Sequence, residues 1–377
     1  MHDSVPSQGS MASARRQGRR QTHRGHSGMT THFHSIAGLA RVSVLGGCAL
    51  LFGTPAQAVT IIPDKSGFSG YVNVGAGGIE FESNLLAGLA SGIVDVGDAY
   101  TDDIDSSPDS DSAVIPMLNF ELSYTFAETR TQLYLGNLLE DFLTFDLSAL
   151  AGVRQDIGGA GILGAALVNT SLSADVWEDP YQLNEKRKDT ESSSLGYRIS
   201  WDRIFNTGLT LQYTSKSVEI DTERSGEALG FSKQQRDLLD RNGDLHNLQV
   251  SYEFHLASSR HILTPRLHYR DADLDGGAMA NDGYGYSLNY IYTHNQRWRW
   301  VFNGLYQNFD YGRINPVYGS RDSAERYGIS TTAFYTAPFG WKPWTLNVTA
   351  AYFEEEHKLD FYDSSVAAVT VALLRRF

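Results

Sequence analysis

Four aspartates with regular spacing are the first residues in this sequence that could do chemistry. Asp271, Asp273 and Asp275, followed by Gly276 and by Asp282 in the twelfth place, reproduce the D-x-D-x-D-G spacing of calcium-binding loops. Carboxylate oxygens at this spacing can surround Ca²⁺, so a calcium site is one hypothesis. The flanking residues predict strands where an EF-hand has helices, and an acidic surface loop is the alternative.

A serine, a histidine and a glutamate could form a hydrolytic site. Ser251 and His268 would lie diagonally across a predicted hairpin with Glu253 nearby, as a nucleophile and its base do. The same residue types are ordinary in a water-filled interior. The sequence contains no H-E-x-x-H, G-x-S-x-G or phosphate-loop motif. We therefore expect no catalytic residues.

Charged residues of both signs occupy alternate positions of the predicted strands and would share one face. An isolated charge in dry surroundings costs too much free energy to be kept, so these residues predict either a water-filled lumen or a plug of paired charges. The candidate lining residues are Arg154, Arg198, Asp202, Glu253, Arg266, His268, Arg270 and Arg299.

The segments that carry these residues have about ten positions each, with an apolar side chain at every second position. Successive side chains of a strand point to opposite faces, so one face would meet lipid and the other water. Aromatic residues are frequent in the apolar set, as at a boundary between lipid and water. The clearest example is Leu118, Phe120, Leu122, Tyr124 and Phe126.

Short connections alternate with long polar ones. Six short turns with both termini on the same side imply fourteen strands, and twelve is the alternative because bacterial barrels close with an even number. The predicted fold is therefore all-β, a transmembrane antiparallel up-and-down β-barrel. The six turns are expected at 127–129, 156–159, 206–208, 257–260, 294–297 and around 338–340.

The long connections would be extracellular loops. The first has seven Asp between Asp95 and Asp111 without a basic partner, which predicts a solvated, mobile loop that is neither a strand nor packed. Ser232 would cap a short helix, Lys233 to Asp240. Residues 138–141 would be a tight outer turn. The long loops are expected at 83–112, 178–193, 221–244, 271–283 and 307–324.

Residues 1–58 have the pattern of a cleaved leader, with Met29 as a possible true start. A basic region precedes the apolar run from Val42 to Phe52, and small residues at Ala56 and Ala58 form a cleavage site. A lipobox ending at Cys48 is the alternative. Cleavage at Ala58 would leave residues 59–377 as the barrel, without cysteine.

The charge of the chain excludes nucleic acid as a partner. The chain has 31 basic and 44 acidic residues, of which six basic residues and one acidic residue precede Val59. The part from Val59 onward therefore has 25 basic and 43 acidic residues and a net charge of −18. Phosphates need Lys and Arg to replace released counterions. No stretch after Ala58 reaches the roughly 18 to 20 apolar residues of a membrane-spanning helix.

Several motifs resemble a known family. The runs 136–143, 176–181, 223–226 and 238–243 are similar to a proteobacterial outer-membrane β-barrel family long carried as a domain of unknown function. The resemblance spans nearly the whole chain after the leader. It implies a barrel and a small porin-like channel, and it supplies no catalytic residues. The terminal Phe377 suits recognition by the barrel-assembly machinery, although Arg375 stands where an apolar residue is more usual.

These observations predict a passive, porin-like channel for small hydrophilic solutes in the outer membrane of a Gram-negative bacterium, with outer-membrane lipids around it. The alternative is a plugged barrel that acts as a surface receptor or adhesin through its acidic loops. An outer-membrane hydrolase is a third hypothesis. No cofactor is expected apart from the calcium ion of the first hypothesis.

Overall fold

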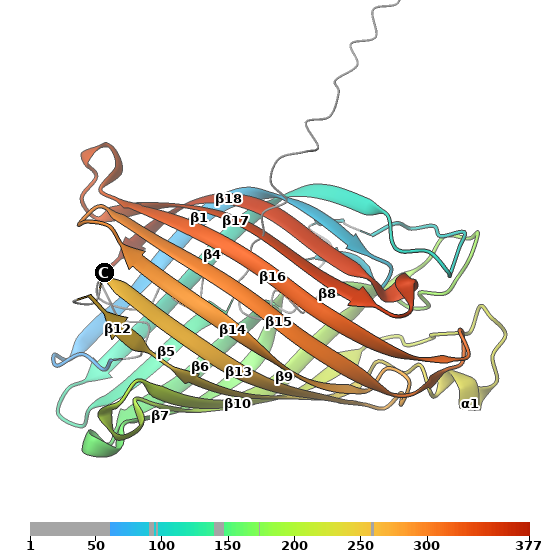
Figure 1. Ribbon diagram of the computed structural model, residues 1–377, viewed down its shortest axis with the longest axis horizontal. Coiled ribbons are helices and arrows are strands. Elements are labelled where there is room, and N and C mark those ends of the chain that lie inside the picture. Colours follow the sequence, from blue (N-terminus) through green and yellow to red (C-terminus); the bar gives the residue numbers. More distant parts are fainter. Residues whose placement is uncertain (1–60, 90–93, 96, 139–146, 173, 258–259) are drawn as a thin grey trace, which may run out of the picture. The chain divides into compact units, whose positions relative to one another are not determined.

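The structure is a computed structural model that describes residues 61–89, 94–95, 97–138, 147–172, 174–257 and 260–377. Within these residues, fourteen antiparallel strands form one closed barrel (Figure 1), which confirms the predicted fold class and strand number. β11 and β12 make one barrel strand that is interrupted at Glu253. The predicted leader, residues 1–58, lies outside the described residues. The barrel strands are β1 (Gly67–Ser83), β4 (Ser110–Phe126), β5 (Thr131–Leu138), β6 (Leu147–Asp156), β7 (Ile162–Leu172), β9 (Asp189–Asp202), β10 (Leu209–Ile220), β11 (Gly243–Tyr252), β12 (Phe254–Leu256), β13 (His261–Leu274), β14 (Asn281–Thr293), β15 (Trp298–Asn315), β16 (Ser320–Thr336), β17 (Trp344–His357) and β18 (Ser364–Arg376).

The barrel closes between its first and last strands. β1 pairs with β18 from Tyr71 opposite Arg376 to Ser83 opposite Ser364, and with β4 on its other side. Beyond the last paired residues, the backbones of Gly70 and Phe377 exchange two hydrogen bonds of 3.1 Å. A closed ladder leaves no strand edge with unpaired amides, as a barrel in lipid requires.

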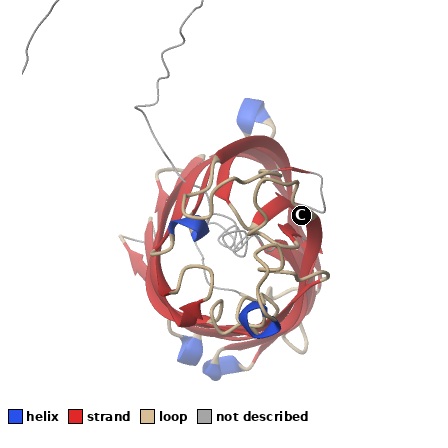
Figure 2. Cartoon of the chain, turned by 90° about the vertical axis from the view of Figure 1, so that its right-hand side faces the viewer, coloured by secondary structure: helices blue, strands red, loops and turns tan. Residues whose placement is uncertain are grey.

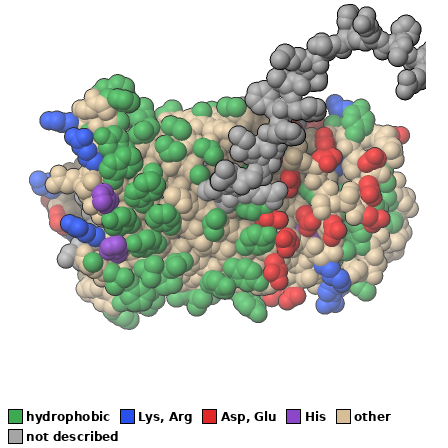
Figure 3. All heavy atoms as spheres, turned by 45° about the horizontal axis from the view of Figure 1, so that its top comes forward, with side chains coloured by type: hydrophobic (Ala, Val, Ile, Leu, Met, Phe, Trp, Pro, Cys, Tyr) green, Lys and Arg blue, Asp and Glu red, His purple; other side chains and the backbone are tan. Residues whose placement is uncertain are grey.

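Alternation separates the two faces as predicted along strands such as β4, although apolar residues also face inward on β1, β13 to β16 and β18. On β4, Leu118 is 58% exposed on the outside while Asn119 is 2% exposed on the inside. Hydrophobic side chains cover the outer surface toward the end that carries the short turns, and acidic side chains gather toward the other end (Figure 3). We call these the turn end and the loop end; in Figure 1 they lie on the left and right.

Aromatic side chains form contacts on the outer surface near the turn end. They would sit at the lipid-water boundary, because an aromatic ring with a polar edge favours that depth. The pairs with ring centroids within 5 Å of each other are Phe68–Tyr124, Tyr124–Phe126, Tyr252–Phe254, His261–Tyr292 and Trp298–Tyr335.

The six short turns lie where they were expected, although residues 258 and 259 of one of them are outside the described part. Three include short 3-10 helices, η2 (Gly158–Ala160), η3 (Ile204–Asn206) and η4 (Pro338–Gly340). Gly and Asn usually supply the positive φ angles of tight turns, and Gly158, Asn206 and Gly340 do so here. Phe205 and Phe339 also have positive φ, at 51° and 52°. Two of the turns therefore hold a bulky residue in the left-handed region.

Two loops are shorter than predicted. β13 continues to Leu274 and β14 begins at Asn281, so the loop expected at 271–283 shrinks to 275–280. The loop expected at 307–324 likewise shrinks to 316–319. In both places the strands continue past the apolar band, where outward side chains such as Asp310 and Glu325 are polar and hide the alternation.

The first loop is partly packed, so the prediction that it is neither a strand nor packed was wrong, whereas its aspartates from Asp98 to Asp111 are exposed to solvent as predicted. It contains β2 (Leu86–Leu89) and β3 (Val94–Asp95), and β2 pairs with β8 (Ala174–Trp177). Ile104 packs against apolar residues of other loops. The aspartates from Asp98 to Asp111 are exposed, and the apolar residues Leu85 and Ile104 make the contact with the other loops. The predicted turn at 138–141 lies mostly outside the described residues.

The predicted helix is confirmed at its start and is shorter than expected. α1 spans Lys233–Arg236, and the side chain of Ser232 forms a capping box with Gln235. A further loop holds the 3-10 helix η5 (Asp360–Tyr362). Among the described residues, no helix is long and apolar enough to cross a membrane.

Pro265 leaves its own strand intact and interrupts its neighbour. β13 runs through Pro265, whose side chain faces outward. The ladder to the preceding strand has Ser251 opposite Arg266 and then Phe254 opposite Leu263, with the interruption at Glu253 between them. Proline has no N–H to donate, so the missing ladder bond falls at the break between β11 and β12.

Candidate functional site

The predicted lining residues lie on the inner face of the barrel. Arg198, which is 9% exposed, stands between Tyr197 and Ile199, which are 45% and 52% exposed on the outside. Arg266 and His268 likewise alternate with the outward Leu267. The others, on the same face by position along their strands, are Arg154, Asp202, Glu253, Arg270 and Arg299.

Arg154 belongs to a bonded group on β4, β5 and β6 near the turn end. Its guanidinium lies 3.8 Å from the centre of the Tyr134 ring. Nη1 is 3.4 Å from Glu121 Oε1 and donates to Gln132 Oε1 at 3.2 Å. Charge and hydrogen-bonding capacity are therefore matched within the wall here, as expected of a lining with both signs.

The histidine of the hydrolase hypothesis forms a hydrogen bond with a different serine. His268 Nε2 shares a hydrogen bond of 2.8 Å with Ser287 Oγ on the following strand. Ser251 stands opposite Arg266 in the β11–β13 register. Glu253 accepts a hydrogen bond of 2.5 Å from His255. The register places Gln249 opposite His268, so Ser251 lies diagonally across from His268 as predicted; among the described residues, no hydrogen bond joins the two side chains.

The aspartates of the calcium hypothesis are drawn out along paired strands. Asp271 and Asp273 lie on β13, and Asp271 is opposite Asp282 of β14. Asp275 follows the end of β13. In the part of the chain that the structure describes, no three His, Cys, Asp or Glu residues are grouped so that they could hold a metal ion. The calcium site stays a prediction without structural support.

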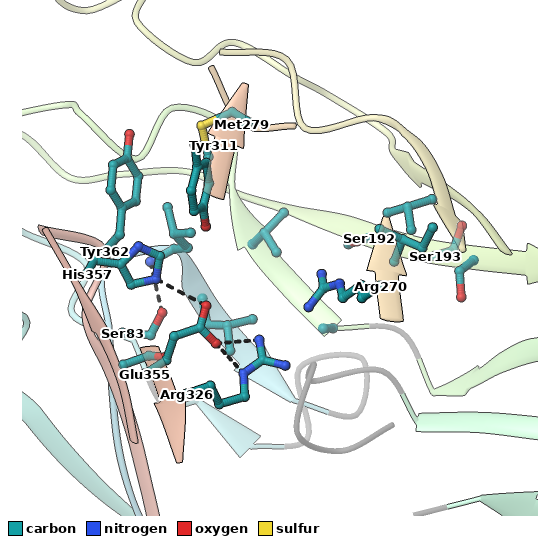
Figure 4. A pocket seen from close by; sticks show the side chains of 18 residues that line it. Ser83, Ser192, Ser193, Arg270, Met279, Tyr311, Arg326, Glu355, His357 and Tyr362 are labelled. Carbon is teal, nitrogen blue, oxygen red and sulfur yellow. Dashed lines mark hydrogen bonds and ion pairs between the residues drawn. The ribbon is translucent and has the colours of Figure 1, made fainter. Parts of the chain in front are cut away.

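A cavity of about 280 Å³ lies inside the loop end of the barrel (Figure 4). One part of its wall is polar and comes from β13, β15, β16 and β17. Another part is apolar and comes from the first loop, β8, β10 and β11. The polar lining residues with charged or aromatic side chains are Arg270, Tyr311, Arg326, Glu355, His357 and Tyr362.

Four ionisable residues form a chain of contacts beside this cavity. His357 Nδ1 is 2.8 Å from Asp322 Oδ2, and its Nε2 is 3.1 Å from Glu355 Oε1. Glu355 also pairs with Arg326. Both nitrogens of the imidazole face a carboxylate oxygen, so both donate and the ring carries its proton.

Packed residues of the loops cover the cavity at the loop end of the barrel. A buried cluster from four loops, which we call the loop cluster, consists of Tyr181, Leu239, Ala278, Met279, Leu359, Phe361 and Tyr362. Figure 2, which views the barrel from the loop end, shows loops reaching inward over the opening. Tyr362 and Met279 belong both to the loop cluster and to the cavity lining.

Hydrogen bonds fix the loop cluster from within. The hydroxyls of Tyr181 and Tyr362 are 2.5 Å apart, and Asn315 Nδ2 donates to the Tyr362 hydroxyl at 2.6 Å. Burial raises the pKa of both tyrosines above its ordinary value, so both hydroxyls keep their protons. The Asp179 carboxylate accepts from three backbone amides, those of Tyr181, Gly226 and Ala228.

Arg187 joins the first loop to the loop after β8. Its side chain is buried, with 1% exposure, and donates to the backbone carbonyls of Asn84, Asp98 and Pro180. Its guanidinium also lies 4.5 Å from the centre of the Trp177 ring. Burial lowers the pKa of Arg187 to about 10, which leaves it charged at neutral pH.

Sequence reasoning missed part of the cavity wall. Glu355 and His357 lie on β17, where the run from Glu354 to Glu356 is acidic on both faces and hides the alternation. Val366 and Phe81 on β18 and β1 form an apolar patch on the inner face, where polar residues were expected. The period of two through Phe353, Glu355 and His357 could have located the missed pair.

Comparison with known proteins identifies a family. Known structures similar to this chain include the outer membrane channel DcaP of Acinetobacter baumannii (12% identity, 83% of this chain and 97% of that chain, TM-score 0.39). A second is an anion-selective porin from Comamonas acidovorans (8% identity, 83% of this chain and 100% of that chain, TM-score 0.38). A third is a Pseudomonas aeruginosa FadL homologue (10% identity, 82% of this chain and 90% of that chain, TM-score 0.40). Because each TM-score lies below 0.5, we take no function from them. No curated protein matches the chain. A family model described as "Protein of unknown function (DUF2860)" matches residues 67–374, and the chain therefore belongs to this family.

Proposed function

We propose that the protein is a passive channel for small hydrophilic solutes in a bacterial outer membrane. The observation that carries this proposal is the division of the strands into an apolar outer face and an inner face rich in charged and hydrogen-bonding groups. Lipid accepts the first face, and only water or polar solutes suit the second. Solute would move down its gradient, without a catalytic step.

The lining supplies positive charge at several depths. Arg299 lies near the turn end, Arg266 and Arg198 lie farther along their strands, and Arg270 borders the cavity. Charged side chains on the wall of a pore set its ion preference because they act on passing ions at close range. The proposal therefore includes a preference for anions.

A plugged surface receptor is the second candidate, and the loop cluster favours it. Loops that share an apolar core over the opening could hold the barrel closed and present their outer faces to a partner. Under this proposal the charged lining would stay paired, as Arg154 and Glu121 are.

Conductance in planar bilayers separates the two candidates. Purified protein should give stepwise currents in salt solution, and a salt gradient should give a reversal potential that favours anions. Heat-shifted migration in detergent gels confirms that each sample is folded. A folded barrel that produces no current at any voltage would exclude the channel and leave the receptor.

A further inference from the structure

An unpaired arginine in the cavity at the loop end points to a ligand. Arg270 is the central charged side chain in Figure 4, where it projects into the cavity between Ser192 and the Glu355–Arg326 pair. Within the described part of the chain, Arg270 makes no hydrogen bond or ion pair. Its guanidinium lies 5.4 Å from the centre of the Phe309 ring. Among the described residues, no side chain or carbonyl accepts a hydrogen bond from its five N–H donors.

The charges around Arg270 do not neutralise it. Arg326 is bonded to Glu355, and the protonated His357 stands between Glu355 and Asp322. Counting only the residues that the structure describes, three cationic groups here face two carboxylates, and the unmatched positive charge is that of Arg270. A charge enclosed by protein is stabilised by an opposite charge at hydrogen-bonding distance, which an anionic ligand would supply.

Five serines also line the cavity, Ser83, Ser192, Ser193, Ser194 and Ser364, and much of the remaining wall is apolar. Leu86, Val176, Val218, Leu245 and Met279 face the same space as Arg270. Leu86 also packs on the apolar inner patch of β1 and β18 that contains Phe81 and Val366. A small inorganic anion would leave this surface against water, whereas an organic acid would cover it with its hydrocarbon part.

The volume limits the size of that acid. A dry cavity of about 150 Å³ is large enough for benzene, and this cavity measures about 280 Å³. The space therefore suits one ring, or a chain of similar bulk, together with a carboxylate and a few waters. We propose that the cavity is a binding site for small monocarboxylates with an apolar body, held by Arg270. This inference rests on the proposed function and names the solute class that the channel would take up.

Binding of benzoate to the whole barrel tests this site. Purified protein in detergent would be dialysed to equilibrium against radiolabelled benzoate, with micelles alone as the blank. Wild type should bind benzoate saturably and at least tenfold more tightly than benzamide, which lacks the charge, and acetate, which lacks the ring. A single bidentate contact to a charged group is worth that factor or more.

Substitutions assign the binding to Arg270. Arg270→Met should weaken benzoate binding at least tenfold, with Arg270→Gln as the second variant if the first does not fold. Arg321→Met removes the same charge from an exposed position of β16 outside the cavity and should bind as wild type does. Benzoate binding that is equal to that of benzamide, or unchanged in both Arg270 variants, would overturn the proposal.

Bilayer currents keep this inference separate from the proposed function. A wild-type barrel that conducts but does not bind benzoate would refute the site and leave the channel. Saturable, Arg270-dependent benzoate binding by a barrel that never conducts would support the site and refute the channel.

Discussion

Replacing Arg187 with methionine should loosen the loop end without unfolding the barrel. Methionine fills the space of the arginine stem but leaves the carbonyls of Asn84, Asp98 and Pro180 without their donor. An acceptor buried without a partner costs about 1 to 3 kcal/mol, and the ring contact with Trp177 adds roughly 0.5 to 2 kcal/mol. Partial rehydration lowers the sum, and we expect a loss of about 3 to 5 kcal/mol in the local stability of these loops.

Two backbone amides report on this loss. Asn184 N–H donates to Thr101 O and Arg187 N–H donates to Ala99 O, both at 2.8 Å, so both are protected only while the two loops are joined. A local loss of about 3 to 5 kcal/mol corresponds to exchange faster by roughly two to four orders of magnitude, since each 1.4 kcal/mol is a factor of ten.

Hydrogen exchange with residue resolution measures the effect. Lys233→Met is the matched control, because it removes an exposed cation whose partner is Asp237, the residue that follows α1. It should leave the amides at 184 and 187 unchanged, and amides in the middle of β16 should be unchanged in both variants. If Arg187→Met leaves the exchange of both reporter amides as in wild type, Arg187 does not hold the loops together and our reading of its carbonyl contacts is wrong.

Three further predictions concern the two faces of the barrel and its mouth. Leu267→Lys places a charge on the lipid face at the middle of β13 and should lower stability by roughly 2 to 4 kcal/mol, measured by urea titration in detergent or lipid; an unchanged midpoint would place Leu267 outside lipid. Arg266→Glu, at the neighbouring inward position, should fold like wild type and shift the reversal potential in a salt gradient toward cations; an unchanged potential in a conducting barrel would mean that Arg266 does not line the path. Arg187→Met should also raise single-channel conductance if the joined loops narrow the mouth, and equal conductance beside faster loop exchange would place the narrowest point elsewhere.

Strands of this fold could be predicted from the sequence only where the outer face of the barrel is apolar and the inner face is polar. Where lipid lies outside and water inside, as along β4, apolar and polar side chains alternate and the strand can be read directly. Past the apolar band the outer face becomes polar too, and the sequence places Asp282 and Asp310 in loops although their backbones continue the ladder.

The candidate site was less predictable for a related reason. Arg270 and Arg266 were found because their strand alternates cleanly. Glu355, His357 and the loop residues above them lie where no period distinguishes inside from outside. Their contacts join segments far apart in the chain, as when Tyr181 meets Tyr362, and neither spacing nor composition encodes such a meeting.

The seam between β1 and β18 brings the start of the first barrel strand beside the end of the last, where a short turn could join them. Gly70 and Phe377 are hydrogen-bonded at the turn end. At that end, six other pairs of neighbouring strands are joined by turns of a few residues. A short linker from Phe377 back to the residues before β1, with new termini cut at 127–130 or 294–297, would preserve every rung of the ladder. Such a circular permutant should reach the same barrel. A chain that stops before β18 should not, because it would leave β1 and β17 as open edges.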